Sequence, residues 1–391
     1  MLRGPVLFGD PARRSANLEL FFDLVVAVAV SQAARLLRLD PTWHGAGLLV
    51  LVFVPLWWAW IGFTFYDNRY TVDDAIHRVS VLAAAIGMGT LGLSLTRVPG
   101  PGVVVLGLAY VFIRLILIGL YMRARRSEPR ARGQAGGYAL GFGLAVLLWA
   151  AGTPLPPGIR LAVWAVAVGV DLATSVLIER RVGLLPVDAD HLVDRFAAFF
   201  IIVLGESIIT TGGLAADAVR RWNFQPVVTL ICTAVLACAV WWGYFDRRAR
   251  ELRAGGLRSS DAGWNAALVY AYGHFPIVLG VVGIGVGAQL AVLEAAGVAA
   301  GPARVVAASG LALYLLGLNL LTLLGRVPLA DSLLVERTGL VAILVVIAVV
   351  GPAGPAAGLA ALIAVALAHV LLNVYRGRRS SLVRPQGSIV G

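Results

Sequence analysis

The stretch LELFFDLVVAVAVSQAARLL, residues 18–37, combines a long apolar run with polar residues at a regular spacing. Polar side chains recur in it at intervals of four or eight residues: Glu19, Asp23, Ser31 and Arg35, with Ala27 at the position between Asp23 and Ser31. Residues four apart lie along one face of an α-helix, and about 20 apolar residues in a helix cross a hydrocarbon layer about 30 Å thick. Because lipid would leave the polar face unsatisfied, we expect it to face the interior of a helix bundle.

The rest of the chain has the same apolar character. Of its 391 residues 59% are apolar and only 14% are charged, and the mean hydropathy is +0.86. These values predict an all-α polytopic membrane protein, with the lipid bilayer as its main partner. Windows of about 19 residues place twelve spans near residues 19–39, 45–67, 77–96, 102–123, 137–152, 159–178, 194–212, 225–245, 266–291, 305–324, 335–350 and 356–375.

The distribution of basic residues predicts the orientation in the membrane. All 32 of them are arginine, and with twelve spans most fall on one side. The positive-inside rule therefore predicts that both termini are cytoplasmic in a multi-pass protein of the inner (plasma) membrane. The formal charge of +11 would suggest nucleic-acid binding in a soluble protein, but topology accounts for the arginines, and we expect no nucleic-acid partner.

The two halves of the chain, residues 1–182 and 183–391, share features in the same order. The segment ELFFDLVVAVAVSQ from Glu19 resembles DRFAAFFIIVLGES from Asp194, each half has a Trp-Trp pair, and His77 corresponds to His274. Ordered matches of this kind indicate an internal repeat. Six spans per half is an even number, so we expect two parallel six-helix repeats related by a pseudo-two-fold axis along the membrane normal, with functional sites between them.

Four strings resemble those of the bacterial low-temperature-requirement protein A family: LELFFDL (18–24), WWAWIGFTFYDNRYTVDD (57–74), IIVLGES (201–207) and YGHFP (272–276). The resemblance implies a polytopic inner-membrane protein and a family name taken from a cold-growth phenotype. It supplies no catalytic residues, so the chemistry has to be argued from the side chains.

Ionisable residues inside the spans are the first candidates for function. A charged side chain at a helix centre costs about 2.5–3.5 kcal/mol on insertion scales, so each implies a partner, a water-filled cavity or a function. Glu206 lies well inside the seventh span, and either an ion pair with Arg114 or binding of protons or monovalent cations would account for it. The predicted substrate or ion pathway comprises Glu206, Arg114, Asp171, His274 and His369.

A second group lies at the cytoplasmic ends of the spans. We expect an acidic entrance formed by Glu19, Asp23, Asp67, Asp73 and Asp74. Glu19 and Asp23 have a simpler alternative, because carboxylates are favourable at the amino end of any helix. The tryptophans nearby fit an interfacial aromatic belt or a lining for a bound ligand: Trp57, Trp58, Trp60, Trp241 and Trp242.

Several classes of protein lack support in the sequence. It contains no Walker loop, GxSxG elbow, HExxH motif or Cys/His metal spacing, so we expect no cofactor and no metal. Cys232 and Cys238 have no CxxC or histidine context and are predicted to be core residues. Gly283, Gly285 and Gly287 lie inside a span and are predicted to permit close helix packing.

Three functional hypotheses follow. The first is a secondary transporter or an ion- or proton-conducting protein, with its pathway between the two repeats and Glu206 as the principal acid. The second is a membrane-embedded enzyme acting on a lipid or hydrophobic metabolite, with His274, Asp67 and Glu206 as acid/base groups. The third is a structural or sensory membrane protein that supports growth in the cold.

Overall fold

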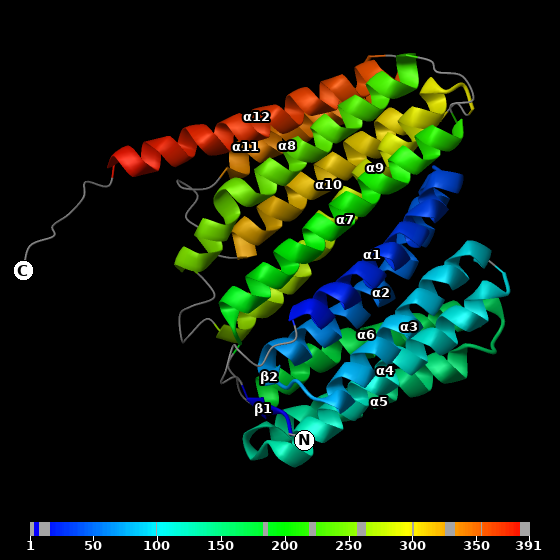
Figure 1. Cartoon of the computed structure of the whole chain (residues 1–391), viewed down its shortest axis with the longest axis vertical. Coiled ribbons are helices and arrows are strands. Elements are labelled where there is room, and N and C mark those ends of the chain that lie inside the picture. The colour runs from blue at the N-terminus through cyan, green and yellow to red at the C-terminus, as the bar shows by residue number, and fades with distance from the viewer. Residues whose placement is uncertain are drawn as a thin grey trace, which may run out of the picture. The chain divides into compact units, whose positions relative to one another are not determined.

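The computed structural model is almost entirely helical (Figure 1) and describes residues 4–7, 16–98, 100–182, 187–218, 224–255, 263–298, 301–324, 333–352 and 354–383. Its first six α-helices are α1 (Ala16–Leu39), α2 (Trp43–Arg69), α3 (Ala75–Ser94), α4 (Gly102–Ser127), α5 (Arg132–Gly152) and α6 (Pro157–Val182). The next six are α7 (Ala189–Ala218), α8 (Phe224–Gly255), α9 (Gly263–Ala295), α10 (Ala303–Leu324), α11 (Leu334–Val350) and α12 (Pro355–Val383). Each predicted span coincides with one of these helices.

Ten of the helices in the described ranges are long and apolar enough to cross a membrane. The two that are not among them are α7 and α11. With 17 residues, α11 is about 26 Å long at 1.5 Å per residue, slightly less than the hydrocarbon thickness. The all-helical, multi-pass architecture is thus confirmed, while the orientation of the termini stays a prediction.

The chain divides into two compact units, and each is described by itself. The first contains Met1–Ile202 with Gly263–Ala267, and the second contains Val203–Ala262 with Leu268–Gly391. The predicted division into repeats at residues 182 and 183 stays a prediction.

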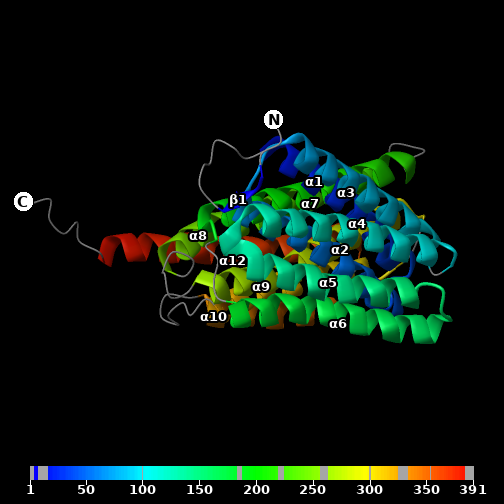
Figure 2. The same cartoon turned by 90° about the horizontal axis from the view of Figure 1, so that it is seen from below.

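In the first unit α2 is the most deeply buried helix. Every residue from Pro55 to Arg69 is buried, which fits a helix that is apolar on all sides. Short connections place α3, α4, α5 and α6 next to one another in sequence order, and α1 packs against α2 and α3 (Figure 2). Asp74 caps α3, because its side chain accepts a hydrogen bond from the backbone N–H of His77.

A small antiparallel pairing of two short strands lies beside the end of α2. β1 (Val6–Leu7) pairs with β2 (Tyr70–Thr71), which directly follows α2. Two short 3-10 helices, η2 (Leu95–Arg97) and η3 (Pro129–Ala131), lead into α4 and α5.

In the second unit α9 and α10 approach closely through glycine. A Cβ atom added at Gly280 would lie 2.5 Å from the backbone nitrogen of Tyr314, and one at Gly287 would lie 2.4 Å from the Cβ of Ala307. Gly283 faces Gly310 in the same way, whereas Gly285 faces Ser207 of α7. The predicted role of the glycine series in close helix packing is therefore confirmed.

Candidate functional site

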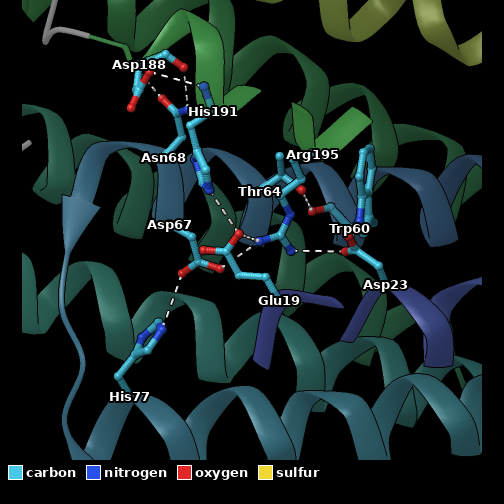
Figure 3. A network of polar contacts seen from close by, with 10 residues as sticks. All are labelled: Glu19, Asp23, Trp60, Thr64, Asp67, Asn68, His77, Asp188, His191 and Arg195. Atoms are coloured by element: carbon cyan, nitrogen blue, oxygen red, sulfur yellow. Dashed lines mark hydrogen bonds and ion pairs between the residues drawn. The ribbon is translucent and has the colours of Figure 1, made fainter. Parts of the chain in front are cut away.

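Three carboxylates surround one guanidinium inside the first unit (Figure 3). Arg195 Nη1 lies 2.7 Å from Glu19 Oε2 and 3.5 Å from Asp67 Oδ2, and Arg195 Nη2 lies 3.1 Å from Asp23 Oδ1. We call these four residues, together with His77 and His191 at their edges, the acidic cluster. All of its members come from the ends of four helices: α1, α2, α3 and α7.

Helical spacing brings these groups to one place. Glu19 and Asp23 are one turn apart on α1, and His191 and Arg195 are one turn apart on α7. Asp67 lies in the last turn of α2. Asp23 is only 1% exposed and lies beyond the first turn of α1, so the simpler alternative of a helix-end carboxylate does not account for it.

An aromatic wall fixes Asp23. Trp60 Nε1 donates a 2.7 Å hydrogen bond to Asp23 Oδ1, and the Trp60 ring stacks on Phe199 of α7 at 4.2 Å. Thr64 Oγ1 donates to the Trp60 backbone oxygen at 3.0 Å. A hydrogen-bonded indole that is fully buried holds the carboxylate rigidly.

The five tryptophans predicted as a belt or lining differ in their surroundings. Trp57, Trp58 and Trp60 are buried, which does not favour a lipid-facing belt for them. Trp241 and Trp242 are about half exposed, as an interfacial residue would be.

Two histidines flank the carboxylates. His191 Nε2 lies 3.0 Å from Glu19 Oε2, and His77 Nε2 lies 3.5 Å from Asp67 Oδ1. His191 is held by its backbone N–H, which donates to Asp188 Oδ1 at 3.1 Å. The backbone of Asp188 exchanges two hydrogen bonds with the Asn68 side chain, at 2.8 and 3.0 Å, and this tethers the start of α7 to the end of α2.

The acidic cluster contains more carboxyl groups than guanidinium groups. Three of its six members are Asp or Glu, and Arg195 is its one arginine. Within the described ranges, Asp23 Oδ2 and Asp67 Oδ1 are buried and have no hydrogen-bond partner. Among the same residues no group of three or more His, Cys, Asp or Glu side chains is arranged to hold a metal ion. Protonation is the chemistry that would correct the imbalance most directly.

The predicted acidic entrance separates into two parts. Glu19, Asp23 and Asp67 lie in the acidic cluster, whereas Asp73 and Asp74 lie at the start of α3 and bond to other arginines. Asp73 pairs with Arg78 at 2.6 Å, and that hydrogen bond lowers the pKa of Asp73. Burial alone would raise the pKa of Asp74, but hydrogen bonds from Arg123 and from the backbone N–H of His77 outweigh it and hold the pKa below its usual 3.8.

Two of the predicted pathway residues form a buried ion pair in the first unit. Arg114 Nη2 lies 2.7 Å from Asp171 Oδ1, and both side chains are fully buried. Tyr110 donates a 2.7 Å hydrogen bond to Asp171 Oδ2. Asp171, rather than Glu206, is thus the carboxylate bound to Arg114.

The other three predicted pathway residues belong to the second unit. Glu206 is half-buried, and its carboxylate accepts a hydrogen bond from Thr210 at 3.1 Å. His274 is buried between Tyr244, at 3.0 Å from Nε2, and the backbone oxygen of Tyr270, at 2.7 Å from Nδ1. His369 is buried too, and its Nε2 lies 3.3 Å from Asn373 Nδ2.

The sequence-based interpretation missed Arg195, His191 and the buried pair of Arg69 with Glu179. Arg195 was assigned to the cytoplasmic arginines that follow from topology alone. A signal was present, since His191 and Arg195 repeat at the same interval of four as Glu19 and Asp23. Arg69 and Glu179 each lie near a helix end, where charged residues are common and do not by themselves suggest a functional site.

The long apolar helices and their buried ionic side chains define the class, a polytopic α-helical membrane protein. The chain belongs to the family of the bacterial low temperature requirement A protein (LtrA), which matches residues 14–374. It is also similar to an uncharacterized protein of Rhizobium meliloti (strain 1021), with 27% identity over 283 residues, which are 69% of this chain and 67% of the relative. No solved structure matches the chain.

Proposed function

We propose that the protein is a secondary transporter or proton-conducting membrane protein in which the acidic cluster binds and releases protons. The observation that carries the proposal is that three buried carboxylates, Glu19, Asp23 and Asp67, share the one guanidinium of Arg195. Uncompensated charge in a medium of low dielectric constant costs several kcal/mol, roughly. A proton on one carboxylate removes that cost, and its release restores it, so the site can load and unload.

Each helix packed against the site contributes a titratable or charged group. These are Glu19 and Asp23 on α1, Asp67 on α2, His77 on α3, and His191 and Arg195 on α7. Histidine is the side chain that ordinarily titrates between about pH 5 and pH 8. His191 and Glu19 are the most exposed members, at 17% and 11% of their side chains, which supports them as the route by which protons enter.

A proton suits the site better than a larger cation. The two Nη atoms of Arg195 lie between the carboxylates, at 2.7–3.5 Å from their oxygens, and fill the place that a metal or alkali ion would need. A proton needs no such space, because it binds to a single carboxylate oxygen.

The topology expected from the arginines is part of the proposal. If both termini lie on the cytoplasmic side of the inner membrane, the start of α1, the end of α2 and the start of α7 lie on that side too. The acidic cluster would then be the cytoplasmic proton site. The sequence-based prediction of a pathway between the two repeats stays a prediction.

The enzyme hypothesis has no single observation in its favour. Of its three acid/base candidates, Asp67 lies in the acidic cluster beside Arg195, His274 bonds to Tyr244, and Glu206 bonds to Thr210. The structural hypothesis predicts that function depends on close helix packing at glycine residues and not on the carboxylates.

Reconstitution into liposomes tests the proposal. Internal pH-sensitive and cation-sensitive dyes are followed after a pH gradient or a membrane potential is imposed. We expect proton flux with the wild-type protein and its reduction to the level of protein-free liposomes in Asp23→Asn and in Glu19→Gln. Asp217→Asn, the same change at an exposed position of α7, is the matched control and should keep its flux.

Two outcomes contradict the proposal. Wild-type protein that passes no protons above the protein-free background, under either driving force, excludes proton transport. Loss of flux in Glu206→Gln with normal flux in Asp23→Asn and Glu19→Gln moves the proton site to the second unit. Size-exclusion profiles of all variants show whether each is folded.

A further inference from the structure

The helix α6 is polar on its buried side and apolar on its exposed side. In the structure as described, its buried residues are Ala167, Asp171, Thr174, Ser175 and Glu179. Its large exposed hydrophobic residues are Ile159, Leu161, Val166, Leu177 and Val182, and the exposed Arg180 and Arg181 follow in its last turn. A helix of a soluble protein shows the opposite arrangement. In a membrane, this one suits a helix with lipid outside and a polar interior.

The polar residues of α6 form one line. Asp171, Ser175 and Glu179 are spaced by four and so lie along one face, and Thr174 lies beside them. At 1.5 Å per residue the line from Asp171 to Glu179 is about 12 Å long. We call these four residues the α6 polar face.

An ion pair lies at each end of the α6 polar face. Asp171 pairs with Arg114 of α4, and Glu179 pairs with Arg69 of α2, and all four side chains are at most 1% exposed. The Arg69–Glu179 pair has further hydrogen-bond partners. Glu179 Oε1 accepts from Gln134 Nε2 at 2.7 Å and from the Tyr138 hydroxyl at 2.8 Å.

Polar atoms along this line are left without protein partners. Among the residues that the structure describes, buried atoms with no hydrogen-bond partner include Glu179 Oε2, Gln134 Oε1, Arg69 Nε and Arg114 Nε. An unsatisfied buried polar group costs about 1–3 kcal/mol. Ordered water, which needs two to four polar partners, is the usual way in which proteins satisfy such groups.

The space beside the α6 polar face is narrow. A Cβ atom added at Gly141 of α5 would lie 2.3 Å from Thr174 Oγ1, and one at Gly137 would lie 2.5 Å from Ile178 Cδ1. Helices in such close contact leave no room for a solute of several heavy atoms.

A series of neighbouring aromatic rings leads from the Arg69–Glu179 pair to the acidic cluster. Ring centroids are 5.0 Å apart for Tyr138 and Tyr121, 5.3 Å for Tyr121 and Tyr66, and 6.2 Å for Tyr66 and His77. His77 contacts Asp67 of the acidic cluster. In the part of the chain that the structure describes, the Tyr66 hydroxyl is buried and has no hydrogen-bond partner.

We propose that the α6 polar face is a hydrated proton path inside the first unit, joining the Arg69–Glu179 pair to the Arg114–Asp171 pair. The polar face has carboxylates at both ends and hydroxyl groups between them, as a relay of protons through water requires. The inference rests on the proposed function, because it names protons as the species that moves. It adds that the path inside the membrane follows α6.

Cysteine substitution tests whether the α6 polar face is wet, without any measurement of flux. In a Cys232→Ala/Cys238→Ala background, Ser175→Cys is compared with Ala173→Cys, which lies on the exposed side of α6. The probe is hydrogen peroxide, which is neutral, crosses lipid and has only two heavy atoms, applied to the full-length protein in liposomes. Only the thiolate reacts, and a thiol in apolar surroundings stays protonated, so the rate reports water at the sulfur.

We expect oxidation of the thiol to sulfinic acid to be much faster at Ser175→Cys than at Ala173→Cys, as followed by mass spectrometry. A rate at Ser175→Cys equal to or below that at Ala173→Cys means that the face is dry, and it overturns the inference. Thr174→Cys is a second buried position with the same expectation, should Ser175→Cys fold poorly.

Flux through blocked variants is the second arm. Ser175→Val places apolar atoms on the α6 polar face and leaves the four residues of the two ion pairs unchanged. Ala173→Val also introduces valine, but on the exposed side of α6. We expect proton flux to fall in Ser175→Val and to stay at the wild-type level in Ala173→Val.

The outcomes separate the two proposals. Normal flux in Ser175→Val combined with lost flux in Asp23→Asn overturns the α6 path and leaves the proposed function standing. If the thiol of Ser175→Cys reacts fast but the wild-type protein passes no protons, the proposed function is overturned. The identification of protons as the conducted species is then overturned as well. A fast reaction of the thiol in Ser175→Cys, together with loss of proton flux in Ser175→Val, supports both the proposed function and the α6 path.

Discussion

The guanidinium of Arg195 lies 2.7 Å from the carboxylate of Glu19, and this contact joins the start of α7 to the first turn of α1. The same guanidinium reaches Asp23 and Asp67. One cation therefore holds three helices together and also sets the charge state of the site. Stability and the proposed proton binding depend on the same group, and variants have to be designed to separate them.

Replacing Arg195 with glutamine should destabilise the protein strongly. The change leaves three buried carboxylates without a cation, and removal of one partner of a buried ion pair costs about 3–5 kcal/mol. Thermal or denaturant unfolding in detergent, followed by circular dichroism, measures the loss. Arg195→Lys keeps the charge but not the forked geometry, and it should lose less.

An exposed arginine gives the matched control. Arg78 pairs with Asp73 at 2.6 Å, but 58% of its side chain is exposed. An exposed ion pair contributes about 0–1 kcal/mol, so Arg78→Gln should change stability by no more than that. Equal losses in the two variants would mean that the guanidinium of Arg195 does not compensate the buried carboxylates.

The sequence allowed the helices to be predicted and part of the site, but not the pairing of side chains. A run of apolar residues shows where a helix crosses lipid, and an interval of four shows that Glu19 and Asp23 share a face. Nothing in either pattern specifies which helix meets that face. Arg195 was therefore missed, because its partners lie on two other helices.

Depth along a helix also proved a weak guide to burial. Glu206 lies well inside α7 and is half-buried, whereas Glu179 lies near the end of α6 and is 2% exposed. Burial depends on the neighbours that a face meets, and this is decided by helix rotation and packing. Arg114 and Asp171 were both predicted as pathway residues, but their pairing depends on the rotation of α4 relative to α6.

Replacing the Arg114–Asp171 ion pair by apolar residues should keep the fold and abolish proton flux. Exchange of a buried ion pair for apolar side chains of similar volume is often neutral, or stabilising by about 1–4 kcal/mol. Arg114→Met/Asp171→Leu should therefore unfold close to the wild-type midpoint. The proton path should fail in the same protein, because neither end of the pair can hold a proton or water.

Each single change supplies a comparison for that double variant. Arg114→Met alone leaves Asp171 unpaired, and Asp171→Leu alone leaves Arg114 unpaired, and each should cost about 3–5 kcal/mol. Full proton flux in a stable double variant would show that the pair is structural and lies outside the path.

The Asp74 cap of α3 should make stability depend on pH in the acid range. The pKa of Asp74 in the folded protein lies below its usual 3.8, because hydrogen bonds from Arg123 and His77 N–H outweigh its burial. A lowered pKa means that the ionised cap stabilises the fold above about pH 4 and that this contribution is lost as the pH falls through the lowered value. Removal of a cap costs about 0.5–2 kcal/mol, so Asp74→Ala should lose that amount near pH 7 and progressively less in acid.

Asp73 is the neighbouring control for the cap. Its pKa is also lowered, by the hydrogen bond from Arg78, but Arg78 is exposed and Asp73 caps no helix. Asp73→Ala should thus lose less than about 1 kcal/mol near pH 7. A loss in Asp74→Ala that stays constant from neutral to acid pH would show that its carboxylate does not titrate with folding.

Close packing of α9 on α10 should make Gly280 intolerant of even one added carbon. The Cβ of Gly280→Ala would lie 2.5 Å from the backbone nitrogen of Tyr314 and 2.7 Å from the backbone oxygen of Gly310, and backbone atoms cannot move aside as a side chain can. Overpacking of this kind costs about 1–3 kcal/mol. Gly205 of α7 is the control, since a Cβ there would meet no described atom within 4 Å, and alanine in its place should stabilise the helix by up to about 1 kcal/mol. If Gly280→Ala lowers the unfolding temperature while its remaining folded fraction conducts protons normally, the glycines serve packing alone. Flux lost in Gly280→Ala and retained in Asp23→Asn would mean that proton flux depends on the packing of α9 on α10 and not on the acidic cluster.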